Sequence, residues 1–272
     1  MAMLILIRGA GEMASGIAYR LHRAGLKVIM TELPQPLAVR RWVCFSEAVY
    51  EGQCTVEGIE ARRVKDPTDS LKILQVMAKG IIPVLIDPEG ESIAALHPTV
   101  VIDARMLKKP VELIPQRINL IIGLGPGFTA GKNCHAAIET NRGHTLGRVY
   151  WEGSPQADTG IPDAVGSVRE KRVLRAPANG IFQPKASIGD HIEEGQIIAE
   201  VNGHSIVAPF KGVLRGLLRE GIEVSQNLKV GDLDPRDDAS YCSLISDKAL
   251  AIGGAALEAI LSRPNLRPHL WT

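Results

Sequence analysis

Short apolar runs alternate with amphipathic segments in the first half of the chain. Residues 3–7 form an apolar run, residues 12–24 place apolar side chains at helical spacing, and residues 27–31 form a second apolar run that ends at Glu32. Gly25 stands where the helix should end. This order predicts two parallel strands joined by a crossover helix.

The same alternation continues toward the middle of the chain. Further apolar runs at residues 81–86, 100–103 and 118–122 predict strands, residues 68–79 predict a helix, and residues 53–64 predict a hairpin around Gly58. Together they predict one parallel sheet of about five or six strands. The fold class expected for residues 1–150 is therefore α/β, a Rossmann-like domain that binds a nucleotide or cofactor.

The second half of the chain changes character. Residues 151–170 are rich in Gly, Pro, Asp and Ser and are interpreted as a linker. An internal repeat offset by 32 residues follows, in which three residues recur in the same order: Ala176, Pro177 and Gly180, then Ala208, Pro209 and Gly212. Two matched halves predict a small β structure over residues 171–236.

This β region resembles the biotinyl/lipoyl-like barrel-sandwich fold. Carrier domains of that fold present a modified lysine on the hairpin between the halves, where this chain reads VNGHS at residues 201–205. Because no lysine is present there, we expect a binding or assembly module without covalent biotin or lipoate. Residues 237–272 are predicted to be a C-terminal helical segment that packs back on the core, with a helix over residues 246–262 that Ser246 caps. In it, Gly253 and Gly254 suggest close contact with a neighbouring helix or with a ligand.

Composition narrows the classes of function. The net charge of +1 and the 4% aromatic content exclude an electrostatic or stacking surface for nucleic acid. No apolar run of about 18 residues exists, so no membrane span is expected. The four cysteines lack metal-ligand spacing, which indicates structural thiols, no metal site and a cytoplasmic protein.

The most informative motif is GAGEMASG at residues 9–16, between the first strand and the first helix. Gly9 permits the tight turn, Gly11 lets a diphosphate approach the backbone, and Ala14 lets the helix pack closely. Free amides at the start of the helix favour an anion, and a turn that has lost its ligand is the alternative. The residues expected to bind the cofactor here are Arg8, Gly9, Gly11, Glu12, Met13 and Ala14.

Glu32 stands 21 residues after Gly11, where an acidic side chain commonly binds ribose hydroxyls. This favours NAD over NADP, although Arg40 and Arg41 could reverse that preference if they do not pair with surface acids. GLGPGFTAG at residues 123–131 is a second glycine-rich loop after a strand. Its backbone amides could bind an anion in the same crevice as those of the first glycine turn, unless the segment is only a surface loop. Gly123, Gly125 and Gly127 complete the predicted cofactor site, together with Glu32.

Other polar residues stand near the expected ends of strands. Asp103 and Arg105 follow the strand at residues 100–103. The segment ETNRGHTLGR contains Glu139, Arg142, His144 and Arg148, and its histidine could be a general base, a phosphate contact or a structural loop residue. No catalytic dyad or triad can be recognised, so the catalytic residues are unknown and enzymatic activity is left open.

Taken together, these motifs resemble a known family. The segments that resemble this family include residues 7–21 (IRGAGEMASGIAYRL), 122–131 (IGLGPGFTAG), 139–144 (ETNRGH) and 246–261 (SDKALAIGGAALEAIL). The chain resembles the YqeB-type accessory proteins of the selenium-dependent molybdenum hydroxylase system. The resemblance implies a role in maturing such hydroxylases, and a related accessory class implies binding of the molybdenum cofactor.

Three hypotheses follow. The first is a maturation factor that binds molybdopterin or its dinucleotide and hands it to a molybdenum hydroxylase apoenzyme or to other maturation factors. The second is an NAD-binding oxidoreductase or sensor, and the third is a non-catalytic assembly scaffold. No nucleic acid or membrane is an expected partner, and a homo-oligomer is compatible with each hypothesis.

Overall fold

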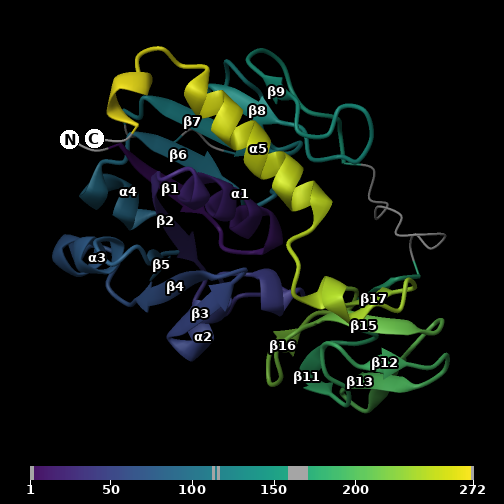
Figure 1. Cartoon of the computed structure of the whole chain (residues 1–272). Coiled ribbons are helices and arrows are strands. Elements are labelled where there is room, and N and C mark those ends of the chain that lie inside the picture. Colours follow the sequence, from purple (N-terminus) through teal and green to yellow (C-terminus); the bar gives the residue numbers. More distant parts are fainter. Residues whose placement is uncertain (1–2, 112–113, 115–116, 159–170, 271–272) are drawn as a thin grey trace. The chain divides into compact units, whose positions relative to one another are not determined.

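The structure is a computed structural model that describes residues 3–111, 114, 117–158 and 171–270. The chain divides into two compact units (Figure 1). The first comprises Met1–Pro36, Cys44–Thr159 and Ile245–Thr272, and the second comprises Leu37–Val43 and Gly160–Leu244. Beyond residue 158, the predicted linker at 151–170 lies outside the described residues.

A nine-stranded sheet forms the centre of the first unit. The strand order is β3-β4-β5-β2-β1-β6-β7-β8-β9, and neighbours pair in parallel except at the two edges, where β3 and β9 are antiparallel. The strands are β1 (Leu4–Arg8), β2 (Lys27–Glu32), β3 (Gln53–Val56), β4 (Ile59–Val64), β5 (Ile82–Ile86), β6 (Val100–Asp103), β7 (Leu120–Leu124), β8 (Ala136–Ile138) and β9 (Val149–Tyr150). The strands predicted from apolar runs are confirmed as elements of this sheet.

The predicted architecture of the sheet is nevertheless wrong. The expectation was one parallel Rossmann-like sheet of about five or six strands, whereas this sheet is mixed and has nine strands. The predicted hairpin forms, but its second strand β4 also pairs in parallel with β5 and so extends the sheet. At the other edge, β8 and β9 are too short to produce a hydrophobic period that sequence analysis could detect.

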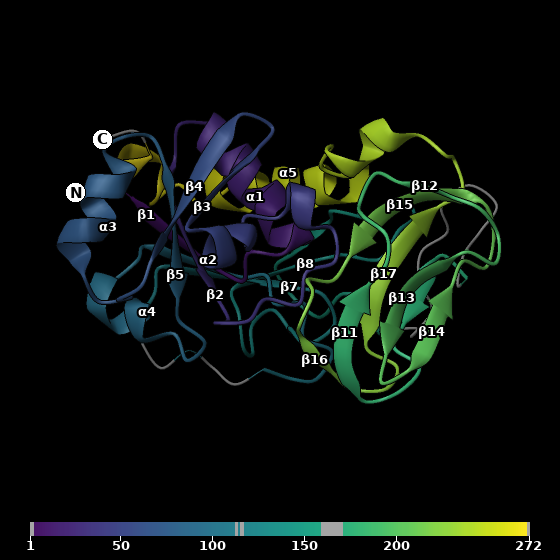
Figure 2. The same ribbon diagram turned by 90° about the horizontal axis from the view of Figure 1, so that it is seen from below.

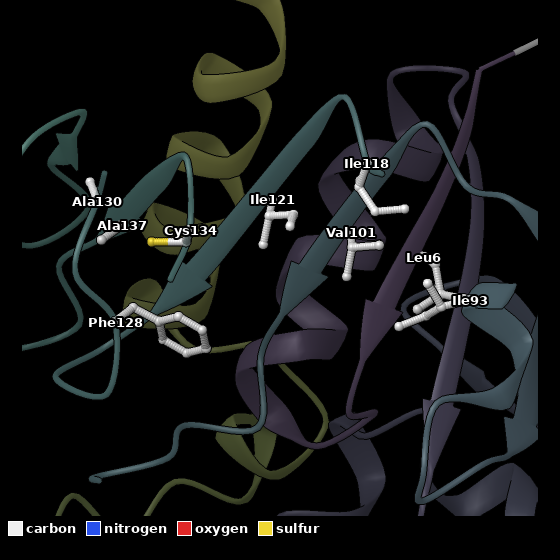
Figure 3. Close-up of a cluster of buried hydrophobic side chains, with 9 residues drawn as sticks. All are labelled: Leu6, Ile93, Val101, Ile118, Ile121, Phe128, Ala130, Cys134 and Ala137. Carbon is white, nitrogen blue, oxygen red and sulfur yellow. The ribbon is translucent and has the colours of Figure 1, made fainter. Parts of the chain in front are cut away.

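Helices cover both faces of the sheet (Figure 2). On one face, α3 (Ser70–Met77) and α4 (Glu91–Leu96) contribute Ile73 and Ile93 to two clusters of buried apolar side chains. Figure 3 shows the second of these clusters along neighbouring strands, with the ribbon of α5 behind them. On the opposite face of the sheet from α3 and α4, α1 (Glu12–Arg23) packs against α5 (Asp247–Leu261).

The C-terminal helix confirms a predicted helix and its cap. The Oγ of Ser246 accepts a hydrogen bond from the backbone N–H of Ala249, and α5 then runs to Leu261. Shorter elements, α2 (Glu47–Glu51) and the 3-10 turns at Arg41–Val43, Ala239–Cys242 and Arg267–His269, were not predicted. Within the described chain, no helix has the length and apolar character needed to cross a bilayer.

The second unit contains two antiparallel four-stranded sheets, ordered β10-β17-β15-β12 and β14-β13-β11-β16. Their strands are β10 (Val173–Arg175), β11 (Gly180–Pro184), β12 (His191–Ile192), β13 (Ile197–Val201), β14 (His204–Val207), β15 (Gly212–Leu217), β16 (Glu223–Val224) and β17 (Lys229–Asp234). The internal repeat is confirmed, because β15, β16 and β17 begin 32 residues after β11, β12 and β13.

The fold class predicted for the whole chain is therefore corrected. What is observed is a large mixed sheet with helices on both faces and, separately, two antiparallel sheets. We do not retain the assignment to a Rossmann-like domain followed by a biotinyl/lipoyl-like barrel-sandwich. Glycine spacing and apolar runs specify short strands and tight turns, but the same pattern suits many β arrangements.

Candidate functional site

The strand order reverses at β1. The strand that follows it in the chain, β2, lies on one side, and β6 lies on the other. In open α/β sheets such a reversal opens a crevice beyond the carboxyl ends of the strands, where ligands commonly bind. At this point a Cβ placed on Gly9, which follows β1, would lie 3.5 Å from the backbone of Ala104, which follows β6. The candidate site is therefore the carboxyl edge of β1 and β6.

The glycine turn presents the amino end of α1 to this edge. Gly9 adopts φ +99° and donates its N–H to the carbonyl of Thr31 at 2.9 Å. Gly11 precedes the helix as its N-cap and has no side chain that could cap this end. A Cβ built on Gly11 would meet nothing within 4 Å, so its backbone is open to a ligand. Of the other predicted residues, Glu12 and Met13 are half-buried in the first turn, and Ala14 is buried.

Glu32 is tied to the turn. Its Oε2 accepts a hydrogen bond from the N–H of Ala10 at 2.9 Å, and its Oε1 accepts one from Leu33 at 2.8 Å. Burial raises the pKa of this carboxyl group, although the two backbone hydrogen bonds oppose the shift. Both carboxylate oxygens of Glu32 already accept hydrogen bonds from backbone N–H groups. The glutamate therefore has a structural role, and fewer of its acceptor sites remain for ribose hydroxyls.

Arg8 and Arg105 meet at one carboxylate beside the turn. Arg105 pairs with Asp103 through Nη2 and Oδ2 at 2.6 Å, and Nη1 of Arg8 lies 3.8 Å from the same Oδ2. The pKa of Arg8 is lowered by burial and by the charge of Arg105, but a guanidinium remains charged. Its buried Nε has no hydrogen-bond partner in the described structure. An acceptor such as a phosphate oxygen would satisfy that donor.

Sequence analysis missed Asp87 at the same edge. This buried carboxylate accepts hydrogen bonds from the N–H groups of Gly90 and Glu91 at 2.9 Å, ahead of α4. Its own N–H donates to the carbonyl of Glu32 at 3.0 Å. An aspartate directly after an apolar strand was the available signal. Its contacts give it the role of fixing the loop beside Arg8.

The second glycine loop follows β7, and its glycines have packing roles. A Cβ on Gly123 would collide with the ring of Phe128, and one on Gly127 would lie 2.5 Å from the carbonyl oxygen of Leu107. The N–H groups of Gly125 and Gly127 donate to the carbonyls of Ile138 and Leu107, both at 3.1 Å. Protein contacts thus account for these glycines, and their binding of a cofactor stays a prediction.

Arg40 and Arg41 belong to the second unit. Arg40 is buried and donates to the carbonyls of Tyr241 and Leu244 at 2.7 and 2.9 Å, while Arg41 donates to the carbonyl of Leu217 at 2.8 Å. Their guanidinium groups therefore bind backbone carbonyls of that unit. These contacts favour neither the surface acids nor the 2′-phosphate that sequence analysis considered for them.

All four cysteines are free thiols. Burial raises the pKa of Cys54 and of Cys134 to about 11 and also raises that of Cys242, while Cys44 is fully enclosed. Reactive cysteines have the opposite character. Among the described residues, no group of three or more His, Cys, Asp or Glu side chains is placed to hold a metal ion.

Comparisons with solved structures gave weak likenesses. An aspartoacylase family protein from Mesorhizobium loti is 11% identical with a TM-score of 0.25, covering 86% of this chain and 85% of that one. A succinylglutamate desuccinylase/aspartoacylase from Rhodobacter sphaeroides is 12% identical with a TM-score of 0.26, covering 85% of each chain. At such scores, the likeness says nothing of this chain's activity.

Comparison with sequences was more specific. No family model matches the chain. The uncharacterized protein YqeB of Escherichia coli (strain K12) is 45% identical over 258 residues, which are 95% of this chain and 47% of that protein. The chain thus spans about half the length of this curated relative. An identity of this size along nearly the whole chain confirms the predicted resemblance to YqeB-type proteins, and the chain belongs to the YqeB family.

Proposed function

We propose that this chain binds a phosphorylated cofactor, molybdopterin or its dinucleotide, at the amino end of α1. In this proposal it acts in the cytoplasm as an accessory factor that delivers the cofactor to a molybdenum hydroxylase apoenzyme or to another maturation factor. The observation that carries the proposal is the open backbone at Gly11, the N-cap residue, which has no side chain to cap the helix. Amides at such an end bind phosphate through hydrogen bonds and the helix dipole.

Two neighbouring cations suit the same ligand. The unpartnered Nε of Arg8 is a buried donor, and Arg105 is held beside it by Asp103 with about a third of its side chain exposed. A phosphate at Gly11 would add negative charge where two guanidinium groups share one carboxylate. The proposal requires no side chain to react, and whether the protein catalyses a reaction does not affect the binding argument.

The test is retention of the cofactor through gel filtration. Protein incubated with molybdopterin, and separately with its cytosine dinucleotide, should elute with pterin fluorescence. Gly11→Asp should lose the pterin because it places a carboxylate at the helix end that the phosphate needs. Gly254→Ala is the matched control, since a Cβ there also meets nothing within 4 Å. Failure of the wild-type protein to retain either form would contradict the proposal.

An NAD-binding oxidoreductase or sensor is the second candidate, because Glu32 stands at the end of β2 beside the glycine turn. Its two backbone hydrogen bonds make this candidate weaker than the first. Titration with NADH, followed by fluorescence, separates the two. Saturable binding at micromolar NADH without pterin retention would favour the second candidate, and binding of neither ligand would favour a non-catalytic scaffold.

A further inference from the structure

A cavity lies in the first unit, between the loop at residues 139–150 and α5. Its volume is about 540 Å³, within the range of small-molecule sites. Its polar lining comes from His144, Arg148 and Tyr150 on the loop and strand side and from Glu258 on α5. The proposed function does not use any of these residues, although the sequence singled out the loop.

The loop that forms one wall is fixed from within. The carboxylate of Glu139 is almost fully buried and accepts hydrogen bonds from the N–H groups of Thr140, Asn141 and Gln156, each at 2.8 Å. The backbone of Glu139 also exchanges hydrogen bonds with Gly147 and Arg148 at 3.0 Å. This carboxylate therefore has a structural role and is not directed at a ligand.

A second charged residue ties the loop to the helix. Both terminal nitrogens of Arg142 pair with the carboxylate of Asp247, at the start of α5, at 2.6 Å. Nearby, Gly147 adopts φ +77°, and a Cβ there would lie 3.3 Å from the carbonyl oxygen of Ala251. The loop is thus held against α5 at two points.

The remaining charged residues of the wall are arranged differently. His144 and Arg148 are exposed to the cavity, as is Glu258 opposite them. In the part of the chain that the structure describes, no hydrogen bond or ion pair engages these three side chains. The ring of Tyr150, by contrast, packs against the buried apolar cluster that contains Ala137. Among the described residues, the loop therefore presents two exposed donor side chains that no protein group engages.

We propose that this cavity binds a small oxyanion that also has a hydroxyl group. Arg148 would pair with the phosphate or carboxylate through two N–H groups, and His144 would add a third donor. Glu258 can only accept hydrogen bonds, so it would bind the hydroxyl group and repel a second negative charge. The expected ligand is thus a phosphate monoester or a hydroxy acid, and diphosphates and dicarboxylates are disfavoured.

The test uses glycerol 3-phosphate and glycerate as probes in calorimetric titrations of the full chain. Because the cavity is lined without Gly11, the wild-type and Gly11→Asp proteins should both bind one of the two probes saturably, at about 1 mM. The probe that binds more tightly identifies the anion as phosphate or carboxylate. No saturable binding of either probe below about 10 mM would overturn the proposal.

Substitutions then locate the binding. Arg148→Gln should lower the affinity for the more tightly bound probe by about tenfold, since a charged hydrogen-bond pair is removed. Arg23→Gln, at an exposed arginine on α1, is the matched control and should change nothing. Glu258→Gln should strengthen binding of inorganic phosphate several-fold by removing a like charge. If Gly11→Asp abolishes probe binding while Arg148→Gln does not, the probe binds at the α1 site, and this inference fails while the proposed function survives.

Discussion

Gly16 of α1 and Gly253 of α5 meet backbone to backbone. A Cβ on Gly253 would lie 2.5 Å from the carbonyl oxygen of Gly16, and a Cβ on Gly16 would lie 2.6 Å from that of Ala249. The two helices can approach this closely only because neither residue has a side chain. The sequence left open whether Gly253 approaches a neighbouring helix or a ligand. The structure shows that it approaches a helix, α1.

We predict that Gly253→Ala destabilises the protein by about 1–3 kcal/mol, because the methyl group must push the helices apart. Its neighbour is the control: Gly254→Ala adds a methyl group in open space and should stabilise α5 by roughly 1 kcal/mol. Urea denaturation followed by tryptophan fluorescence would measure both changes. Equal effects of the two substitutions would contradict the close crossing.

The second prediction separates binding from stability at the glycine turn. Gly11 has φ −71° and ψ −172°, an extended backbone that an aspartate N-cap also adopts. Gly11→Asp should therefore leave thermal stability unchanged or raise it by a few tenths of a kcal/mol. The same variant should lose the pterin in gel filtration. A variant that binds the pterin as the wild type does would exclude this helix end as the phosphate site.

The third prediction concerns the carboxylate shared by two arginines. Asp103→Asn leaves the largely buried Arg8 with a weakened partner and should cost about 3 kcal/mol of unfolding free energy. Arg105 is about one-third exposed, so Arg105→Gln should cost less than about 1 kcal/mol. If Arg105 contacts the cofactor, the second variant should still lose about tenfold in affinity. Unchanged affinity would restrict Arg105 to a structural role.

The fourth prediction concerns thiol chemistry. Burial raises the pKa of Cys54 and Cys134 to about 11, so at pH 8 these thiols are protonated and should react slowly with iodoacetamide. Mass spectrometry should show rapid labelling only after unfolding. Since the folded-state pKa is raised, the stability from these two groups is intact below pH 9 and falls as the pH rises through about 11. Rapid labelling of a native cysteine would reopen a role in sulfur or selenium transfer.

The fifth prediction concerns the charged core of the second unit. Asp232 is buried and pairs with Arg215 at 2.6 Å and with Arg172. Burial opposes its ionisation, but Lys229 and these two arginines hold its pKa below the ordinary value. Asp232→Asn should therefore cost about 3–5 kcal/mol, because two buried cations lose their shared partner.

An exposed pair provides the control for that substitution. Glu193→Gln breaks the ion pair with Lys211 on the surface of the same unit and should have little effect. The lowered pKa of Asp232 also determines how the stability of the protein depends on pH. Its contribution to stability is complete above its ordinary pKa and is lost as the pH falls below about 4. A wild-type protein equally stable at pH 7 and pH 3 would contradict this assignment.

The sequence by itself determined the local elements. Apolar runs and helical spacing located β1, α1, β2 and α5 to within a residue or two, because those signals depend only on which faces are buried. The repeat likewise predicted two matched halves in the second unit, and strands of the two halves begin 32 residues apart. The glycine turn was recognisable because close backbone approach requires residues without side chains.

The tertiary structure decided what those elements do together. Pairing between strands added β3, β4, β8 and β9 to the sheet, and no local period encodes such pairing. The partners of single groups were also beyond the sequence. Glu32 accepts a hydrogen bond from the backbone of the glycine turn, and Gly127 packs against the carbonyl of Leu107. Similarly, Arg142 is paired with Asp247, whereas Arg148 lines a cavity. Residue type states what a group can bind, but only the fold decides which partner lies within reach.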